Sequence, residues 1–136
     1  MEWTQARLTY EVGATDVSTT ASEALELGRG VCQDFVHLSL ALLRTAGIPA
    51  RYASGYLHPQ TEAETGETVV GQSHAWLEAW AGDWQAFDPT NGAEVGHRHV
   101  LVARGRDYGD VVPLKGVFHG PSNASVDVHV AITRVA

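Results

Sequence analysis

The sequence predicts an α+β domain in which a buried central helix packs on an antiparallel sheet. Apart from residues 1–10, helical patterns are confined to residues 20–46, where capping and stop signals delimit two helices. The remainder is dominated by short segments with alternating apolar residues, separated by turn residues. A cluster of helices followed by a run of strands is typical of the α+β class.

Composition supports one compact domain and excludes several kinds of partner. The chain has 136 residues, of which 44% are hydrophobic and 18% charged, so it is globular rather than disordered. Nine Lys and Arg against sixteen Asp and Glu give a net charge of −7, which argues against nucleic acid or an anionic membrane as the main partner. No apolar run approaches the ~20 residues of a membrane span, and the N-terminus lacks a signal-peptide pattern, so we expect a cytoplasmic protein.

Of the first two helical patterns, only the second has a signal for the start of a helix. Residues 1–10 resemble the end of a helix without its beginning, so we expect the chain to be a fragment that lacks an upstream domain. Thr20 and Glu23 form a capping-box pattern, which predicts a short helix that continues to about Leu27. Gly28-Arg29-Gly30 then ends it.

The segment Cys32–Ala46 predicts the central helix. Gly47 stands at the position after its last turn and Pro49 follows, and both residues are typical helix terminators. Apolar residues cover most of its circumference, which indicates a helix buried on most sides.

Strand patterns follow the central helix. We expect strands at Ala50–His58, Ser73–Trp80, Trp84–Asp88, His99–Ala103 and Ser125–Val135, the last with Val126, Val128, Val130 and Ile132 facing inward. A polar, Glu-rich loop is expected at 59–72, and a turn at 81–83.

The turn at 81–83 decides which residues can meet across the hairpin. Partners on two antiparallel strands have a constant sum of residue numbers. A two-residue turn gives an odd sum and places His74 and Asp88 on opposite faces, whereas a three-residue loop pairs Trp80 with Trp84 and brings His74 within one diagonal step of Asp88, about 7–8 Å between backbones. A five-residue loop centred on Ala81 pairs His74 with Asp88 directly. We therefore predict an odd-length or bulged loop.

Cys32 is the chain's one cysteine, so it forms no internal disulfide and no Cys-based zinc cluster. A free cysteine is most often a small buried apolar residue. Here it follows a Gly-Arg-Gly-Val turn and opens a long helix, where unpaired N–H groups and the helix dipole favour a thiolate nucleophile.

His74 and Asp88 could complete a catalytic set with Cys32. A histidine in a strand is more often structural than catalytic. Here, however, a nucleophile, a base that takes its proton and a carboxylate that orients the imidazole are all available. Their spacing alone is weak evidence, because many globular chains contain these three residue types.

Several motifs in order carry a resemblance to a known family. They are residues 30–38 (GVCQDFVHL), 47–52 (GIPARY) with Gly55-Tyr56, 73–76 (SHAW), 87–92 (FDPTNG) and 105–108 (GRDY). Together they resemble the transglutaminase-like superfamily, in particular its bacterial cysteine protease branch, from about Tyr10 to the end. The resemblance implies a papain-like fold with Cys32 as nucleophile, His74 as base and Asp88 as the orienting carboxylate.

The resemblance also bears on what surrounds this core. Residues 1–136 would form the transglutaminase-like catalytic core, and bacterial members usually have a β-rich domain upstream of it. Animal members need calcium and use an upstream tryptophan to support the oxyanion. The chain has no acidic calcium loop, and Trp3 is a loose match for that tryptophan, so we expect no cofactor and do not carry over the cross-linking reaction.

The expected function is acyl transfer from an amide of a peptide or protein substrate through a thioester on Cys32. Hydrolysis is favoured over cross-linking because water needs no second binding site. The oxyanion would be held by the Cys32 N–H and one further donor, which could be the Gln33 N–H, Trp3 or a loop group. A binding module without turnover and a histidine-based metal protein are rival hypotheses.

Other polar residues receive structural interpretations. His97 and His99 could hold a metal, but no third ligand is evident nearby, and we expect a packed or solvent-facing pair. Asp34 is expected to act as a helix-dipole charge or a tie to the neighbouring strands. Arg106 is expected either in an ion-pair network near the site or in a solvated loop, and the tryptophans of the hairpin are expected to pack on the sheet.

Overall fold

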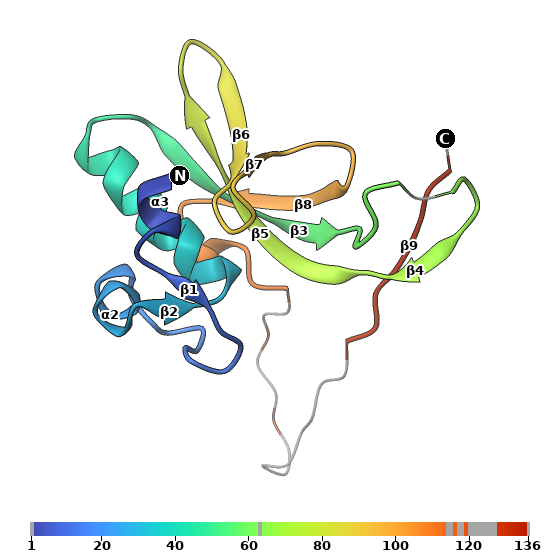
Figure 1. Cartoon of the computed structure of the whole chain (residues 1–136), viewed down its shortest axis with the longest axis horizontal. Coiled ribbons are helices and arrows are strands. Elements are labelled where there is room, and N and C mark those ends of the chain that lie inside the picture. The colour runs from blue at the N-terminus through green and yellow to red at the C-terminus, as the bar shows by residue number, and fades with distance from the viewer. Residues whose placement is uncertain (1, 63, 114–115, 117–118, 120–127, 136) are drawn as a thin grey trace.

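The computed structural model describes residues 2–62, 64–113, 116, 119 and 128–135, and it has the predicted α+β architecture. The helices are α1 (Glu2–Gln5), α2 (Ala21–Leu27), α3 (Cys32–Thr45) and the 3-10 helix η1 (Tyr108–Asp110). The central antiparallel sheet has the order β7-β6-β5-β3-β8 and consists of β3 (Ala50–Leu57), β5 (Gln72–Trp80), β6 (Trp84–Asp88), β7 (Ala93–Glu94) and β8 (His99–Gly105). Figure 1 shows α1, α2 and α3 gathered on one side of this sheet.

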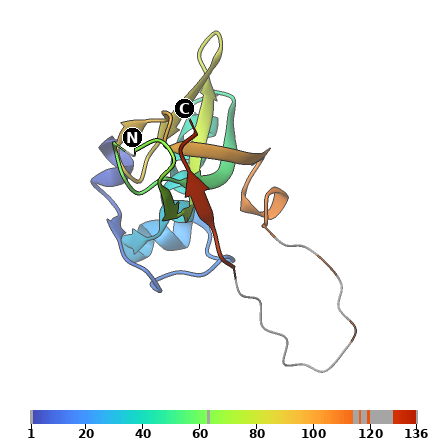
Figure 2. The same cartoon turned by 90° about the vertical axis from the view of Figure 1, so that its right-hand side faces the viewer.

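Two small sheets complete the architecture. A parallel pair joins β1 (Thr9–Tyr10) to β2 (Arg29–Gly30), and an antiparallel pair joins β4 (Thr68–Val70) to β9 (Ala131–Thr133). Figure 2 shows β9 lying against β4 at one end of the domain.

Helix α2 begins as its capping box predicts. The Thr20 hydroxyl accepts a hydrogen bond from the Glu23 N–H (3.3 Å), and the Glu23 carboxylate accepts one from the Thr20 N–H (2.8 Å). Gly28 ends the helix with φ +67°, a left-handed conformation that glycine adopts without steric strain.

Helix α3 is the central helix, but it is buried over only part of its length. Phe35, Val36, Leu38 and Leu40 have at most 4% of their surface exposed. Leu42 is 41% exposed, so the expectation of burial on most sides is wrong for the last turns. These turns project beyond the strands in Figure 1. No helix in the described part of the chain is long and apolar enough to cross a membrane.

The core lies between α3 and the central sheet. Val36 and Leu40 of α3 pack with Tyr52 of β3 and with Ala75 and Leu77 of β5. The half-buried Cys32 packs against the same cluster, so the start of α3 is held against the sheet by the core itself.

The β5–β6 hairpin has a three-residue loop, which agrees with the prediction of an odd-length or bulged loop. Trp80 pairs with Trp84 and Leu77 with Phe87, which leaves residues 81–83 outside the pairing. Gly82 adopts φ +98° at the centre of this loop, and the Trp80 and Trp84 rings meet edge to face with centroids 5.6 Å apart. Continued by one residue, this register places Trp76 opposite Asp88 and His74 on the same face.

The ends of the chain differ from the predicted elements. Among the described residues 2–10, the structure has a four-residue helix followed by the short β1, and the expected loop at 59–72 contains β4. The strand predicted at Ser125–Val135 is confirmed only for Ala131–Thr133; residues 125–127, with Val126, lie outside the described residues. Val128 is 73% exposed and does not face inward, because in the described residues pairing with β4 starts only at Ala131.

Gly55 allows β3 and β8 to approach beside the site. The β3–β8 register shifts between Ser54 and Gly55, and a Cβ atom at Gly55 would overlap the carbonyl group of Val100. The neighbouring atoms belong to a paired backbone, so they cannot move aside as a flexible side chain would.

We expect Gly55→Ala to lower the free energy of unfolding by about 2–3 kcal/mol, because the two strands must separate locally to admit the methyl group. Urea denaturation followed by circular dichroism measures this change. Gly96→Ala is the matched control, since a Cβ there meets no atom within 4 Å. Equal stabilities of the two variants would contradict the close approach at Gly55.

Candidate active site

The turn before α3 fixes the position of Cys32. The buried Asp34 carboxylate accepts hydrogen bonds from the Val31 N–H (2.7 Å) and from the Thr15 hydroxyl (2.6 Å). A Cβ at Gly30 would lie 2.5 Å from the same carboxylate oxygen, so only glycine leaves room for it. Asp34 therefore holds Cys32 at the first position of the helix through Val31 and Thr15; neither residue lies in a strand, so the expected tie to the neighbouring strands is not what these contacts form.

His74 lies between a carboxylate and the thiol. Its Nε2 is 2.7 Å from the Oδ2 of Asp88, and its side chain is almost fully buried. The Cys32 thiol is close enough to this imidazole to raise its pKa, and Nδ1 is the ring nitrogen that Asp88 leaves available. The structure therefore brings His74 and Asp88 into hydrogen-bond contact, with Cys32 beside them at the start of α3.

Asp88 is completely buried, and its carboxylate is saturated with hydrogen bonds. Oδ1 accepts from the backbone N–H groups of Thr90 (3.0 Å) and Asn91 (3.2 Å). Oδ2 accepts from His74, from the Asn91 amide (2.7 Å) and from His99 (3.2 Å). Five donors around one carboxyl group favour its ionised form.

The electrostatics of the pair follow from these contacts. Burial alone would raise the pKa of Asp88, but the hydrogen bonds from His74 and His99 outweigh it and hold that pKa far below its usual range. Burial would likewise lower the pKa of His74, whereas its hydrogen bond to Asp88 and the nearby Cys32 thiol raise that pKa to about 9. The geometry thus favours an imidazolium paired with the Asp88 carboxylate near neutral pH.

His99 belongs to this cluster, although nothing in the sequence pattern indicated its contact with Asp88. Its Nδ1 accepts a hydrogen bond from the Gly96 N–H (3.3 Å), so Nε2 carries the proton that is donated to Asp88. The Trp76 ring packs edge-on against the His99 ring with centroids 5.2 Å apart. His97 is exposed, so the two histidines do not form the pair expected from their spacing.

The cluster could also hold a metal. One ligand atom each of His74, Asp88 and His99 can be chosen so that all three lie within 4.8 Å of one another. The expectation that His99 has no third ligand nearby is therefore wrong, because strand pairing brings it to His74 and Asp88. In the geometry described, these atoms already hydrogen-bond to one another through Asp88.

Donors for an oxyanion are available at the start of α3. The first N–H groups of a helix have no acceptor within it, and Cys32 and Gln33 occupy these positions. The Gln33 side chain donates to the Val17 carbonyl (3.2 Å) and is engaged elsewhere. Thr4 contacts Ser39 (3.0 Å), two turns along α3 from Cys32, so the neighbouring Trp3 lies on a helix anchored away from the thiol.

The charged residues after β8 do not join the site cluster. Arg106 forms an ion pair with Asp110 (2.9 Å), and the Arg106 side chain is 84% exposed. An ion pair forms, but it is exposed to solvent, which agrees with the expected solvated loop rather than with a network near the site. Trp76 is buried in the sheet, whereas Trp80 and Trp84 pack on each other and stay partly exposed.

Comparison with known proteins finds a matching family model and several similar proteins. The family model described as "Transglutaminase-like superfamily" matches residues 1–89. An uncharacterized protein of Mycobacterium leprae is 51% identical over 98% of this chain and 48% of its own length. An uncharacterized protein of Mycobacterium tuberculosis is 41% identical over 91% of this chain and 42% of its own length. The chain thus spans about half the length of these curated relatives.

Two further similarities involve proteins with functional descriptions. A protein-glutamine gamma-glutamyltransferase of Pseudomonas aeruginosa is 35% identical over 65 residues, which are 45% of this chain and 10% of that protein. The crystal structure of a candidate cysteine protease from Cytophaga hutchinsonii superposes with a TM-score of 0.73 at 30% identity, over 96% of this chain and 42% of that one. The match of the family model over most of the chain, together with this likeness of fold, shows that the chain belongs to the transglutaminase-like superfamily.

Proposed function

We propose that this domain is a cysteine-nucleophile acyl-transfer enzyme that acts on amide bonds, with Cys32 as nucleophile, His74 as acid and base, and Asp88 as the orienting carboxylate. The observation that carries the proposal is the position of His74, which hydrogen-bonds to a buried carboxylate and lies beside a thiol at a helix N-terminus. That arrangement supplies an activated nucleophile and a proton donor in one place.

In the first half-reaction, the Cys32 thiolate attacks the amide carbonyl carbon and a C–S bond forms. The N–H groups of Cys32 and Gln33 stabilise the oxyanion. The His74 imidazolium then protonates the amide nitrogen, the C–N bond breaks and the amine leaves. The products of this step are a thioester on Cys32 and a neutral imidazole held by Asp88.

In the second half-reaction, His74 takes a proton from a water molecule, which attacks the thioester. The C–S bond breaks, the acyl group leaves as a carboxylic acid, and the thiolate–imidazolium pair returns. A second amine in place of water would give transfer instead of hydrolysis. We favour hydrolysis, because water needs no binding site of its own.

The test is a panel of peptide amides, including glutamine side-chain amides, assayed with and without a primary amine such as glycine ethyl ester. We expect release of the amine or ammonia, with the hydrolysed acid as main product even when the added amine is present. A product that is mostly the new amide would replace hydrolysis by transfer. Absence of both products across peptide and protein amides would favour a binding module without turnover.

The pH profile provides a second expectation. Because the pKa of His74 is raised to about 9, the imidazolium persists up to that pH and is lost above it. The stabilising contribution of its pairing with Asp88 is present below pH about 6.5 and is lost as the pH rises through 9. We therefore expect kcat/KM for amide hydrolysis to fall above pH about 9. A profile still rising at pH 10 would contradict the role of His74 as the proton donor.

A metal protein is the second candidate, and the short distances among His74, Asp88 and His99 are the observation that favours it. Metal analysis of protein purified without chelator distinguishes it from the enzyme. A stoichiometric metal that is lost in His99→Ala would favour a metal protein, whereas a metal-free protein with a reactive thiol agrees with the enzyme.

A further inference from the structure

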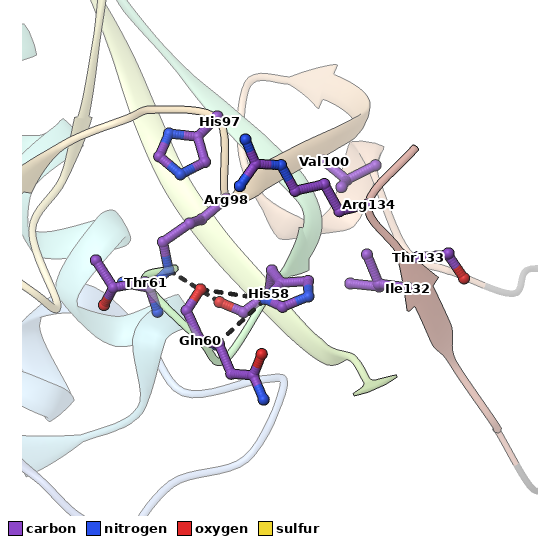
Figure 3. Close-up of a pocket in the computed structure, with 9 residues that line it drawn as sticks. All are labelled: His58, Gln60, Thr61, His97, Arg98, Val100, Ile132, Thr133 and Arg134. Carbon is purple, nitrogen blue, oxygen red and sulfur yellow. Dashed lines mark hydrogen bonds between the residues drawn. The ribbon is translucent and has the colours of Figure 1, made fainter. Parts of the chain in front are cut away.

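A pocket of about 170 Å³ lies at the end of the central sheet, beside the strand position of His99. It is formed where β3 ends, where β8 begins and where β9 crosses, as Figure 3 shows. The lining residues are His58, Gln60, Thr61, His97, Arg98, Val100, Ile132, Thr133 and Arg134. No acidic side chain is among them in the described part of the chain.

The buried side chain of His58 has an unsatisfied ring nitrogen at this pocket. His58 is 6% exposed, and its Nε2 has no hydrogen-bond partner in the described structure. Its Nδ1 lies 3.2 Å from both the N–H and the carbonyl oxygen of Gln60; in the tautomer that accepts from the N–H, the proton is on Nε2. In Figure 3 this edge of the ring faces away from Gln60, toward Ile132. A buried N–H without a partner is unfavourable unless an acceptor binds there.

Arg98 places a fixed positive charge beside His58. Its guanidinium donates to the carbonyl groups of His58 and Pro59 (both 3.0 Å), which hold it in place without neutralising it. No carboxylate in the described part of the chain forms an ion pair with Arg98. Arg134 and His97 line the same pocket, so it gathers basic groups in a chain of net charge −7.

We propose that this pocket binds a compact oxyanion, a carboxylate or phosphate group, carried by the substrate. The inference rests on the proposed function, because it assigns the pocket to the same substrate as Cys32. Gly55 pairs with His74, and His58 lies three residues further along the chain, roughly 10 Å at about 3.3 Å per residue. Because side chains alternate between the faces of a strand, this count gives the distance along β3 and not the path of a substrate, and peptides of two to four residues bracket it.

The first test measures anion binding without catalysis. Sodium acetate and inorganic phosphate are titrated separately against the whole chain while the histidine ring resonances are followed by NMR, with His58 assigned through His58→Gln. We expect a saturable shift of the His58 signals with at least one anion, and a dissociation constant at least about tenfold higher in Arg134→Gln. Arg29→Gln is the matched control, because Arg29 is an exposed arginine paired with Glu11 elsewhere.

Two results of this titration would overturn the proposal. One is a set of His58 shifts that do not saturate with either anion. The other is an equal rise of the dissociation constant in Arg29→Gln and Arg134→Gln, which would indicate only general charge attraction. Saturation by phosphate alone or by acetate alone identifies which oxyanion the pocket prefers. His97→Gln provides a second variant at an exposed position if Arg134→Gln fails to fold.

The second test links the pocket to Cys32. Iodoacetyl peptides of two, three and four residues are prepared with either a free C-terminal carboxylate or a carboxamide; each alkylates the thiolate with loss of iodide. We expect the acid to react several-fold faster than the matched amide at the length that spans the two sites, and the ratio to fall to about one in His58→Gln and Arg134→Gln. Inorganic phosphate should remove the same preference in wild-type protein by competing for the pocket.

The two hypotheses fail in different ways. A Cys32 that reacts no faster with iodoacetamide than an ordinary thiol contradicts the proposed function, whatever the anion titration shows. A rapidly reacting Cys32 with no preference for acid over amide at any length contradicts the recognition of an anionic substrate and leaves the catalytic proposal standing.

Discussion

Replacement of Cys32 by alanine is expected to abolish amide turnover while the fold is retained. The substitution removes the only atom that can form the thioester, and no other cysteine is present in the chain. Alanine is a good helix former, and Cys32 is only half-buried against the core cluster, so the loss of stability should stay below about 1 kcal/mol.

The measurement compares initial rates on the best amide of the panel for wild type and Cys32→Ala, with urea denaturation of both proteins as the control for folding. Cys32→Ser is an informative companion, because the hydroxyl keeps the geometry but is a much poorer nucleophile at neutral pH. Undiminished hydrolysis by purified Cys32→Ala would end the assignment of Cys32.

Asp88→Asn is expected to reduce turnover by about tenfold to a thousandfold and to destabilise the domain. Asp88 accepts five hydrogen bonds, two at Oδ1 and three at Oδ2. In either orientation, the NH₂ group of an asparagine would replace one of these acceptor oxygens and would face hydrogen-bond donors. It also carries no charge, so the pKa of His74 should fall from its raised value of about 9.

Three measurements separate these effects for Asp88→Asn: kcat/KM as a function of pH, the NMR titration of His74, and the urea midpoint. We expect the alkaline limb of activity and the His74 titration to move to lower pH together. Asp83→Asn is the control, since Asp83 is an exposed acid in the loop of the same hairpin. Wild-type rates with an unshifted profile would remove Asp88 from the mechanism.

The elements around Cys32 and His74 were predictable because local rules determine them. The capping box at Thr20, the glycine after α3 and the odd-length loop at 81–83 depend on residues near one another in the chain. The loop length alone excludes a register in which His74 and Asp88 lie on opposite faces. Counting residues along the two strands was thus enough to predict that His74 and Asp88 lie on the same face.

The contacts that were missed depend on pairing between distant segments. His99 reaches Asp88 only because β8 pairs with β3 and their register shifts beside Gly55. Pairing of β4 with β9 joins residues more than sixty positions apart and closes the pocket around His58. The exposed Val128 shows the same limit, because alternation in a sequence does not reveal where pairing starts.

The rate of Cys32 alkylation by iodoacetamide as a function of pH tests the central claim most directly, and it requires no substrate. If His74 holds Cys32 as a thiolate–imidazolium pair, labelling of the wild type is rapid and nearly constant between pH about 6 and 8, below the pKa of His74 near 9. In His74→Gln the rate at pH about 6.5 should fall at least tenfold and should rise steeply with pH. Superimposable profiles for the two proteins would contradict the activation of Cys32 by His74.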